Sequence, residues 1–183
     1  MTGIGEQSLR WFAGTRVEVE PDVSALVGEY SGLLYRVALS VLRNTAEAED
    51  VVQDAFVRVL QQQKLSDVRE MRPWLVRIVW NLALDRRRRA PVDQMDEEFA
   101  ASLVDRSLPA DDVLQETQRM RAVLREMERL PTGERDVLRL SALEELATTE
   151  IAKVLGRSES SVRSLLFRAR TRLRERLEKG GGA

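Results

Sequence analysis

Apolar residues recur along most of this chain at intervals of three and four positions, which is the spacing of one face of an α-helix. No segment alternates apolar and polar residues as a half-buried strand does, and no internal repeat is visible. The pattern therefore predicts an all-α fold.

Three helices are predicted in the first half of the chain. The first runs from about Val23 to Leu42, along the apolar stripe Leu26, Tyr30, Leu33, Leu34, Val37 and Val41. The second follows Asn44 and Glu47, which form a capping-box pair, and its inner face carries Val52, Ala55, Phe56 and Val59. After a loop with a short turn, the third begins at Pro73 and places inward Leu75, Ile78, Val79 and Leu82.

Residues 90–112 interrupt this periodicity with two prolines and an excess of acidic residues. They hold seven acidic side chains and one basic one, whereas residues 25–89 hold eleven basic and eight acidic, and residues 113–183 fifteen and eleven. We interpret residues 90–112 as a flexible acidic linker between two small helical domains, 25–89 and 113–179. The leader, 1–24, and the tail, 180–183, are expected to be partly or wholly disordered.

Composition excludes several kinds of chemistry. The chain has no cysteine and no histidine, so it offers no thiolate nucleophile, no imidazole base and no thiolate or imidazole metal ligand. No segment looks long and apolar enough to span a bilayer. The N-terminus also lacks the basic-then-apolar order of a secretory signal peptide, so we expect a cytoplasmic protein.

The segments "TTEIAKVLG" and "SESSVRSLLFRARTRL" have the spacing of a helix-turn-helix motif. Ala152 is small enough for close helix packing, Gly156 suits a turn with positive φ, and Val162 fills the angle between the helices. Ser158 is a natural N-cap for the second helix. The motif predicts DNA binding; the alternative is a plain helical hairpin with a solvated basic face.

The second helix of this motif has an apolar inner face and a basic outer face. Inward positions are Val162, Leu165, Leu166, Ala169, Leu173 and Leu177, and outward positions include Arg163, Phe167, Arg170 and Arg174. Serines 160, 161 and 164 lie near its start. Such a helix suits phosphates along its flank and base edges near its N-terminus.

The helix from Pro73 carries aromatic, amide and charged side chains on one stripe, namely Trp74, Arg77, Asn81, Asp85 and Arg88. This combination can stack an unpaired base and hold its phosphate. Both Trp74 and Trp80 can equally be core residues. The four arginines Arg86–Arg89 either complement a helix C-terminus or contact DNA backbone.

Taken together, "AEAEDVVQDAFVRVL", "RPWLVRIVWNLALDRRRR" and "LPTGERDVLRLSALEELATTEIAKVLGRSESSVRSLLFRARTRL" resemble the bacterial extracytoplasmic-function (ECF) sigma factors of RNA polymerase. The resemblance covers roughly residues 25–178. It implies a sigma-2-like helical domain, a linker and a sigma-4-like helix-turn-helix domain. It also implies a protein without catalysis or cofactor that binds core polymerase, recognises the minus-10 and minus-35 promoter elements and promotes DNA melting.

The resemblance also assigns roles to residues. Core polymerase, through its beta-prime clamp helices, would contact Glu49, Asp50, Gln53 and Asp54; the alternative is an ordinary acidic helix start. Minus-10 reading would fall to Trp74, Arg77, Asn81, Asp85 and Arg88, with the loop 64–72. Minus-35 reading would fall to Ser160, Ser161, Arg163, Ser164, Phe167 and Arg168. Many relatives have a basic residue where this chain has Leu165, so the preferred sequence is expected to differ.

Further partners follow from the same resemblance. The helices around "LPTGERDVLRLSALEEL" would meet the beta flap of the polymerase, and an anti-sigma factor is an expected inhibitor. The acidic linker either imitates nucleic acid in a basic channel or is a solvated spacer. Mimicry predicts altered abortive transcription or promoter escape after neutralisation of Asp93, Asp96, Glu97 and Glu98.

Two other classes of function remain open from the residues alone. A stand-alone regulator would use the helix-turn-helix to bind a palindromic duplex without polymerase, and its N-terminal block would be a sensing or dimerising domain with a ligand pocket. A carboxylate-dependent hydrolase would need Glu47, Asp50 and Asp54 to form an all-oxygen magnesium site.

Overall fold

The computed structural model describes residues 22–62, 65–89, 97–104, 107, 109–142 and 146–180. All regular structure in these ranges is helical, which confirms the all-α fold class. The helices are α1 (Val23–Leu42), α2 (Thr45–Leu60), the 3-10 turn η1 (Leu65–Asp67), α3 (Met71–Arg89), α4 (Glu97–Ser102), α5 (Ala110–Glu128), α6 (Thr132–Ala142), α7 (Thr148–Leu155) and α8 (Glu159–Gly180).

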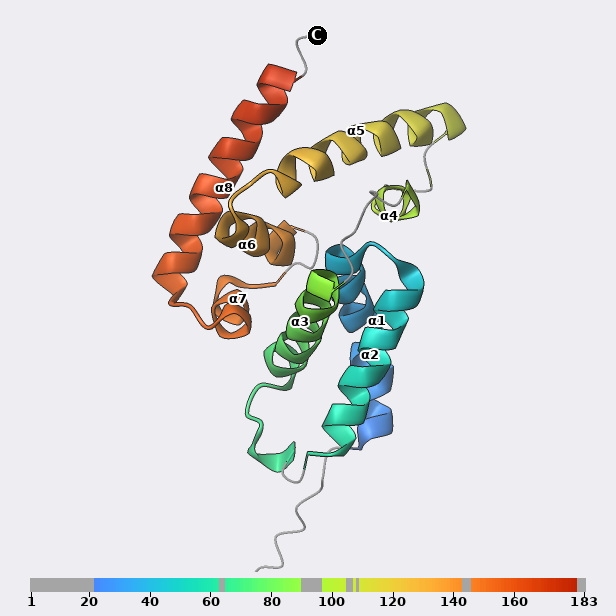
Figure 1. Ribbon diagram of the computed structural model, residues 1–183, viewed down its shortest axis with the longest axis vertical. Coiled ribbons are helices and arrows are strands. Elements are labelled where there is room, and N and C mark those ends of the chain that lie inside the picture. Colours follow the sequence, from blue (N-terminus) through green and yellow to red (C-terminus); the bar gives the residue numbers. More distant parts are fainter. Residues whose placement is uncertain are drawn as a thin grey trace, which may run out of the picture.

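Helices α1, α2 and α3 pack against one another as the first domain (Figure 1). Their core is mostly aliphatic, and its fully buried side chains include Leu34, Val37, Val41, Val51, Val59, Leu75 and Val79. The predicted start of α2 is confirmed, because the Asn44 side chain accepts a hydrogen bond from the Glu47 amide at 3.0 Å. At the end of α1, Arg43 adopts a left-handed conformation with φ 56°. This turn sends the chain back into α2.

The expectation that no segment could span a membrane was wrong by the criteria of length and composition alone. Helix α1 has 20 residues and a mean hydropathy of 1.2 over its most apolar window. Half of that window is buried inside the protein. The apolar character of α1 thus serves the contacts with α2 and α3, as in the core helix of a globular domain.

The segment predicted as a linker contains regular structure. Helix α4 lies within it and packs against α5, with Phe99 and Ala100 buried. Helix α5 begins at Ala110, so Asp111 and Asp112 of the acidic segment stand in its first turn, where carboxylates complement the helix dipole. Residues 90–96 lie outside the described residues, as do most of the leader and residues 181–183.

Helices α5–α8 form the second domain, in which α7 and α8 are the predicted helix-turn-helix. Gly156 has φ 62° and closes α7 by donating its backbone N–H to the Ala152 carbonyl. Ser158 caps α8 by accepting from the Ser161 amide at 3.2 Å. Ile151 and Val162 are fully buried between the two helices. The motif is therefore confirmed down to the residues that shape its turn.

The two domains are in direct contact. Helix α7 packs against α3, so the helix-turn-helix lies beside the first domain in Figure 1. Three sets of ion pairs bridge the boundary: Arg72 with Glu150, Lys153 with Glu70, and Glu128 with both Arg43 and Arg87. Nothing in the sequence pattern indicated this arrangement.

Candidate nucleic-acid interface

The outer stripe of α3 lies where the sequence placed it. Arg77, Asn81, Asp85 and Arg88 are exposed, and Trp74 is half-buried at the start of the helix. We call these five residues the α3 face. Trp80, by contrast, is only 2% exposed and belongs to the core. Of the two tryptophans, only Trp74 is placed to meet a ligand.

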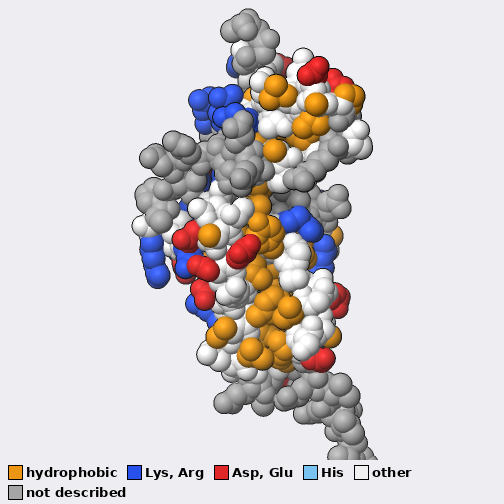
Figure 2. Space-filling model, turned by 90° about the vertical axis from the view of Figure 1, so that its right-hand side faces the viewer, with side chains coloured by type: hydrophobic (Ala, Val, Ile, Leu, Met, Phe, Trp, Pro, Cys, Tyr) orange, Lys and Arg blue, Asp and Glu red, His pale blue; other side chains and the backbone are white. Residues whose placement is uncertain are grey.

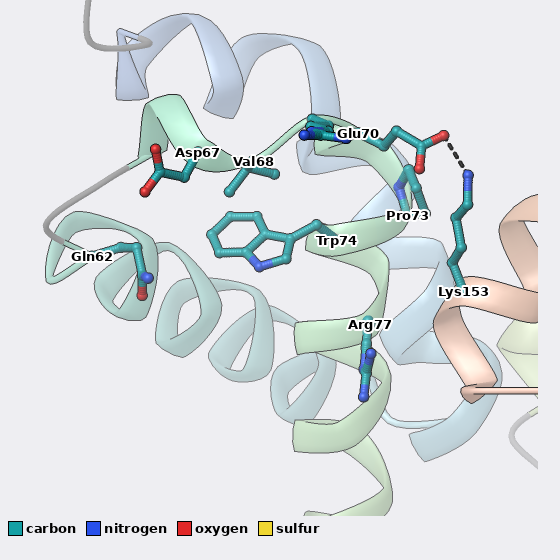
Figure 3. Close-up of a pocket in the computed structure, with 9 residues that line it drawn as sticks. Gln62, Asp67, Val68, Glu70, Pro73, Trp74, Arg77 and Lys153 are labelled. Carbon is teal, nitrogen blue, oxygen red and sulfur yellow. Dashed lines mark hydrogen bonds and ion pairs between the residues drawn. The ribbon is translucent and has the colours of Figure 1, made fainter.

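Trp74 lines the larger of the pockets described here, with a volume of about 680 Å³. The other lining residues come from the end of α2, the η1 loop, α3 and α7: Gln62, Asp67, Val68, Arg69, Glu70, Pro73, Arg77 and Lys153. Figure 3 shows the Trp74 indole projecting from α3 into the space beside Val68, on the side of Gln62. An aromatic ring, an apolar side chain and two arginines are the groups that hold an unstacked base and its phosphate.

The four arginines at the end of α3 have different surroundings. The Arg86 guanidinium pairs with Glu47 at 2.7 Å and Asp50 at 3.6 Å, both on α2. Arg87 pairs with Glu128 at 2.7 Å, and Arg88 pairs with Asp85 one turn earlier. Arg89 is exposed at the helix end. Arg86 and Arg87 therefore have partners within the protein. The four arginines do not form one uniform surface for DNA.

Helix α2 presents an acidic and apolar outer surface. Glu49, Asp50, Gln53 and Asp54 are all exposed, as the sequence predicted for this face. Towards the end of the helix the surface continues with two apolar side chains, Val57 at 50% and Leu60 at 65% exposure. Figure 2 shows hydrophobic side chains gathered in a strip on this side of the first domain.

Val57 and Leu60 were not predicted as part of this surface, although the sequence holds a signal for them. Both residues lie off the inner stripe of α2, and Val57 falls one turn after Gln53 and Asp54. Exposed apolar side chains beside carboxylates suit contact with a protein better than contact with DNA.

The outer side of α8 is open to solvent. Arg163, Ser164 and Arg168 are exposed, and Phe167 is 73% exposed. We call these four residues the α8 face. Ser160 and Ser161 stand at the start of the helix, where the free amides of a helix N-terminus favour phosphate. Because Arg163 pairs with Glu159 only at 3.6 Å and both side chains are largely exposed, this cation stays available to a ligand.

A cluster of ionised side chains lies between the domains, centred on Glu128 at the end of α5. Its carboxylate pairs with Arg43 and Arg87 of the first domain and with Arg135 and Arg139 of α6. Burial would raise the pKa of Glu128, but Arg139, Arg43 and Arg87 outweigh that effect and hold the pKa at about 2. Glu128 is thus a fixed negative charge shared by both domains.

Burial disfavours the charged form of two arginines in this cluster. Arg139 is fully buried, and burial lowers its pKa to about 10 despite the opposing effect of Glu128. Burial also lowers the pKa of Arg43. Both guanidinium groups pair with Glu128, so its removal would leave two buried cations without this carboxylate.

Two of the three carboxylates considered for a magnesium site form ion pairs with an arginine. Glu47 and Asp50 both face the Arg86 guanidinium. Among the described residues, no group of three or more acidic side chains is placed to hold a metal ion.

Comparisons with known proteins agree with this geometry. Residues 26–91 match the family described as sigma-70 region 2, and residues 120–173 match that described as sigma-70, region 4. The chain is 30% identical to the ECF RNA polymerase sigma factor SigW of Bacillus subtilis over 163 residues, which cover 83% of this chain and 87% of SigW.

Two further similarities extend this result. Over 147 residues the chain is 34% identical to the probable RNA polymerase sigma factor RfaY of Xanthomonas campestris, covering 77% of this chain but 36% of RfaY. The solved structure of CnrH in complex with the cytosolic domain of CnrY is similar with a TM-score of 0.60 and 28% identity. That similarity covers 86% of this chain and 88% of the CnrH chain.

Proposed function

Because the chain belongs to the ECF family of RNA polymerase sigma factors, alternative sigma factors of transcription initiation, we propose that it carries core polymerase to promoters through its α3 and α8 faces. The observation that carries this proposal is the presence of two separate helix faces, one per domain, that each combine an aromatic ring, arginines and small polar side chains. The α3 face, with the adjoining pocket, suits unpaired bases. The α8 face suits the major groove of a duplex.

At the minus-10 element, the first domain would capture a base that leaves the stack as the duplex opens. Trp74 offers a ring for stacking, and Arg77 and Asn81 follow at one-turn spacing along α3. An amide can pair with a base edge, and a guanidinium can hold the adjacent phosphate. Melting is favoured because the unpaired base gains contacts that the duplex cannot make.

At the minus-35 element, α8 would enter the major groove with its N-terminal half. Arg163 and Ser164 can reach base edges, and Phe167 offers apolar contact to a thymine methyl group. The helix start and its serines would contact phosphates and set the register.

The outer surface of α2 would bind core polymerase. Its carboxylates can pair with basic side chains of the beta-prime clamp helices, and Val57 and Leu60 add apolar area next to them. The region around α6 would meet the beta flap. An anti-sigma factor is an expected further partner, since the related CnrH was solved in complex with the cytosolic domain of CnrY.

We propose that the protein acts as a cytoplasmic, non-enzymatic specificity subunit of the polymerase. Its family is non-enzymatic, and the chemistry of its two faces is recognition. A stand-alone regulator, whose first domain would need a ligand pocket, is the competing function, but the stripe of Trp74, Arg77 and Asn81 along α3 favours nucleic acid over a small ligand.

Reconstituted transcription tests the proposal. Purified protein mixed with core polymerase should start RNA synthesis at specific genomic sites, and neither component should do so alone. The variant Asn81→Ala/Arg163→Ala should lose specific initiation, because it removes one contact from each face. Arg129→Ala is the matched control, since Arg129 is an exposed arginine that pairs with Glu126 and belongs to neither face. Tight binding to a palindromic duplex without polymerase would favour the regulator.

A further inference from the structure

A buried carboxylate on α6 lies beside the cationic side of the α8 face. Resting on the function proposed above, we infer that this residue, Glu134, determines part of the sequence preference of α8 without contacting a base itself. It is a positioning residue that holds the Arg168 guanidinium for a base edge of the minus-35 element. The same charge weakens the attraction of α8 for the phosphates of other DNA.

Glu134 stands in the first turn of α6 and is buried. Its Oε1 atom lies 3.7 Å from Nε of Arg168, and its Oε2 atom lies 3.4 Å from Nη1 of Arg172, one turn farther along α8. Both distances are longer than those of strong hydrogen bonds, so the carboxylate acts on the two arginines mainly through its charge. Because a buried charge is screened less than an exposed one, this restraint persists at physiological salt.

The packing of α6 on α8 fixes the place of this carboxylate. The two helices are in contact and lie side by side in Figure 1. A Cβ atom added to Gly133 would lie 3.5 Å from Cδ2 of Leu165, which directly follows Ser164 of the α8 face. The start of α6 therefore lies against the half of α8 that would enter the major groove.

The arginines of α8 fall into two groups. Three of them follow one another at four-residue spacing, and each lies within 3.7 Å of a carboxylate of α5 or α6: Arg168, Arg172 and Arg176. Three others are exposed on the outer side: Arg163, Arg170 and Arg174. Arg168 belongs both to the paired group and to the α8 face, so it is the side chain through which a change at Glu134 would reach DNA.

This pairing suits Arg168 to a base rather than to a phosphate. Its side chain is 54% exposed, and the atom nearest the carboxylate is Nε, so the two terminal nitrogens are left for DNA. A guanidinium in a fixed orientation can donate from two nitrogens to O6 and N7 of guanine, the commonest specific contact in the major groove. An unrestrained arginine reaches the phosphates of any sequence. The carboxylate therefore acts as a repulsive element against sequences that offer no base contact.

A promoter library tests this role in the holoenzyme. The minus-35 element of a promoter found by reconstituted transcription is randomised, and the sequences that initiate are determined for each variant with core polymerase. Arg168→Ala identifies the base position that Arg168 reads. Glu134→Gln keeps the size of the side chain but removes its charge, and should lower the preference at that same position about tenfold. Positions that depend on Arg163 should keep their preference.

Binding to a duplex of mixed sequence gives a readout that damage to the fold would move in the opposite direction. The full-length Glu134→Gln protein should bind such a duplex, about 20 base pairs long, about two- to fourfold more tightly than the unaltered protein, because two arginines become free for phosphates. Damage to the fold would weaken this binding. Glu126→Gln is the matched control: its carboxylate pairs with Arg176, farther along α8, and its loss should leave the base preference unchanged.

A second variant tests the inference even if Glu134→Gln does not fold. Arg168→Lys keeps the charge that faces Glu134 but offers one nitrogen instead of a planar pair, so it should lose the same preference. The inference is overturned if no position depends on Arg168, if the preference survives Glu134→Gln or Arg168→Lys, or if Glu134→Gln lowers preference equally at every position. Weaker binding of Glu134→Gln to the mixed duplex also overturns it.

These failures are distinct from failure of the proposed function. An unaltered holoenzyme that starts no specific transcripts would overturn the function. An unaltered holoenzyme that reads the minus-35 element equally well with Glu134→Gln would overturn only the role of Glu134.

Discussion

The α3 and α8 faces carry similar chemistry in very different surroundings. Each combines an aromatic ring, arginines and small polar side chains on one side of a helix. Phe167 of the α8 face is 73% exposed, whereas Trp74 is half-buried in a pocket that α7 helps to line. The aromatic ring of the α8 face is therefore open to solvent, whereas that of the α3 face lies in a pocket lined by both domains.

The largest expected effect comes from removing the charge that joins the two regions. Glu128→Gln leaves Arg43, Arg87 and Arg139 without their shared carboxylate, at a cost of about 3–5 kcal/mol in the free energy of unfolding. Urea unfolding measures this cost. The matched change Glu126→Gln affects more exposed pairs and should cost at most about 1 kcal/mol. Equal costs for the two variants would contradict the central role of Glu128.

Low pH should weaken the same contact between the domains. The pKa of Glu128 is depressed to about 2, so its stabilising effect is complete above its ordinary pKa of 4.5 and is lost as pH falls towards 2. The full contribution is on the order of 3 kcal/mol. Burial raises the pKa of Asp136, which acts in the opposite direction and reduces the net loss. Urea midpoints should therefore fall below about pH 4.5, and less steeply in Glu128→Gln.

A substitution in the turn between α7 and α8 should perturb the α8 face without removing an ion pair between the domains. Gly156→Val places a β-branched residue at φ 62°, which should cost about 1–2 kcal/mol and distort the angle between α7 and α8. Gly156→Asn should be much milder, since asparagine tolerates this conformation. Thermal unfolding and binding of a minus-35 duplex would reveal the difference. Similar behaviour of valine and asparagine at this position would show that the turn is not constrained.

The smallest expected effect separates the two faces in the free protein. Arg163→Ala should weaken duplex binding about tenfold, because it removes a contact from the open α8 face. Arg77→Ala should change that binding less than about twofold, since Arg77 belongs to the α3 face, which suits unpaired bases rather than a duplex. Fluorescence anisotropy at fixed salt compares them. In the holoenzyme, by contrast, both variants should lower specific initiation.

Local features were predictable from the sequence because they depend on neighbouring residues. The bounds of α1, the Asn44 cap, the Gly156 turn and the exposed stripe of α3 all follow from spacing and backbone preference. Helix α4 escaped prediction, because six residues carry too little periodic signal. The choice between Trp74 and Trp80 as the core residue also needed the packed bundle.

The contact between the domains could not be predicted, because it joins residues far apart in the chain. Arg43 and Glu128 are separated by 85 positions, and Arg72 and Glu150 by 78. In the sequence each looks like an ordinary surface charge at a helix end. Only the packing of the second domain on the first gives Arg43 and Arg72 these partners.

The distance between the domains tests this account most directly. The chain has no cysteine, so the variant Gln61→Cys/Thr149→Cys can carry a fluorophore pair at two exposed positions beside the pocket that Gln62 and Lys153 share. Energy transfer should be high in the free protein and fall sharply when core polymerase and promoter DNA are added. Equal transfer in the two states would contradict the account.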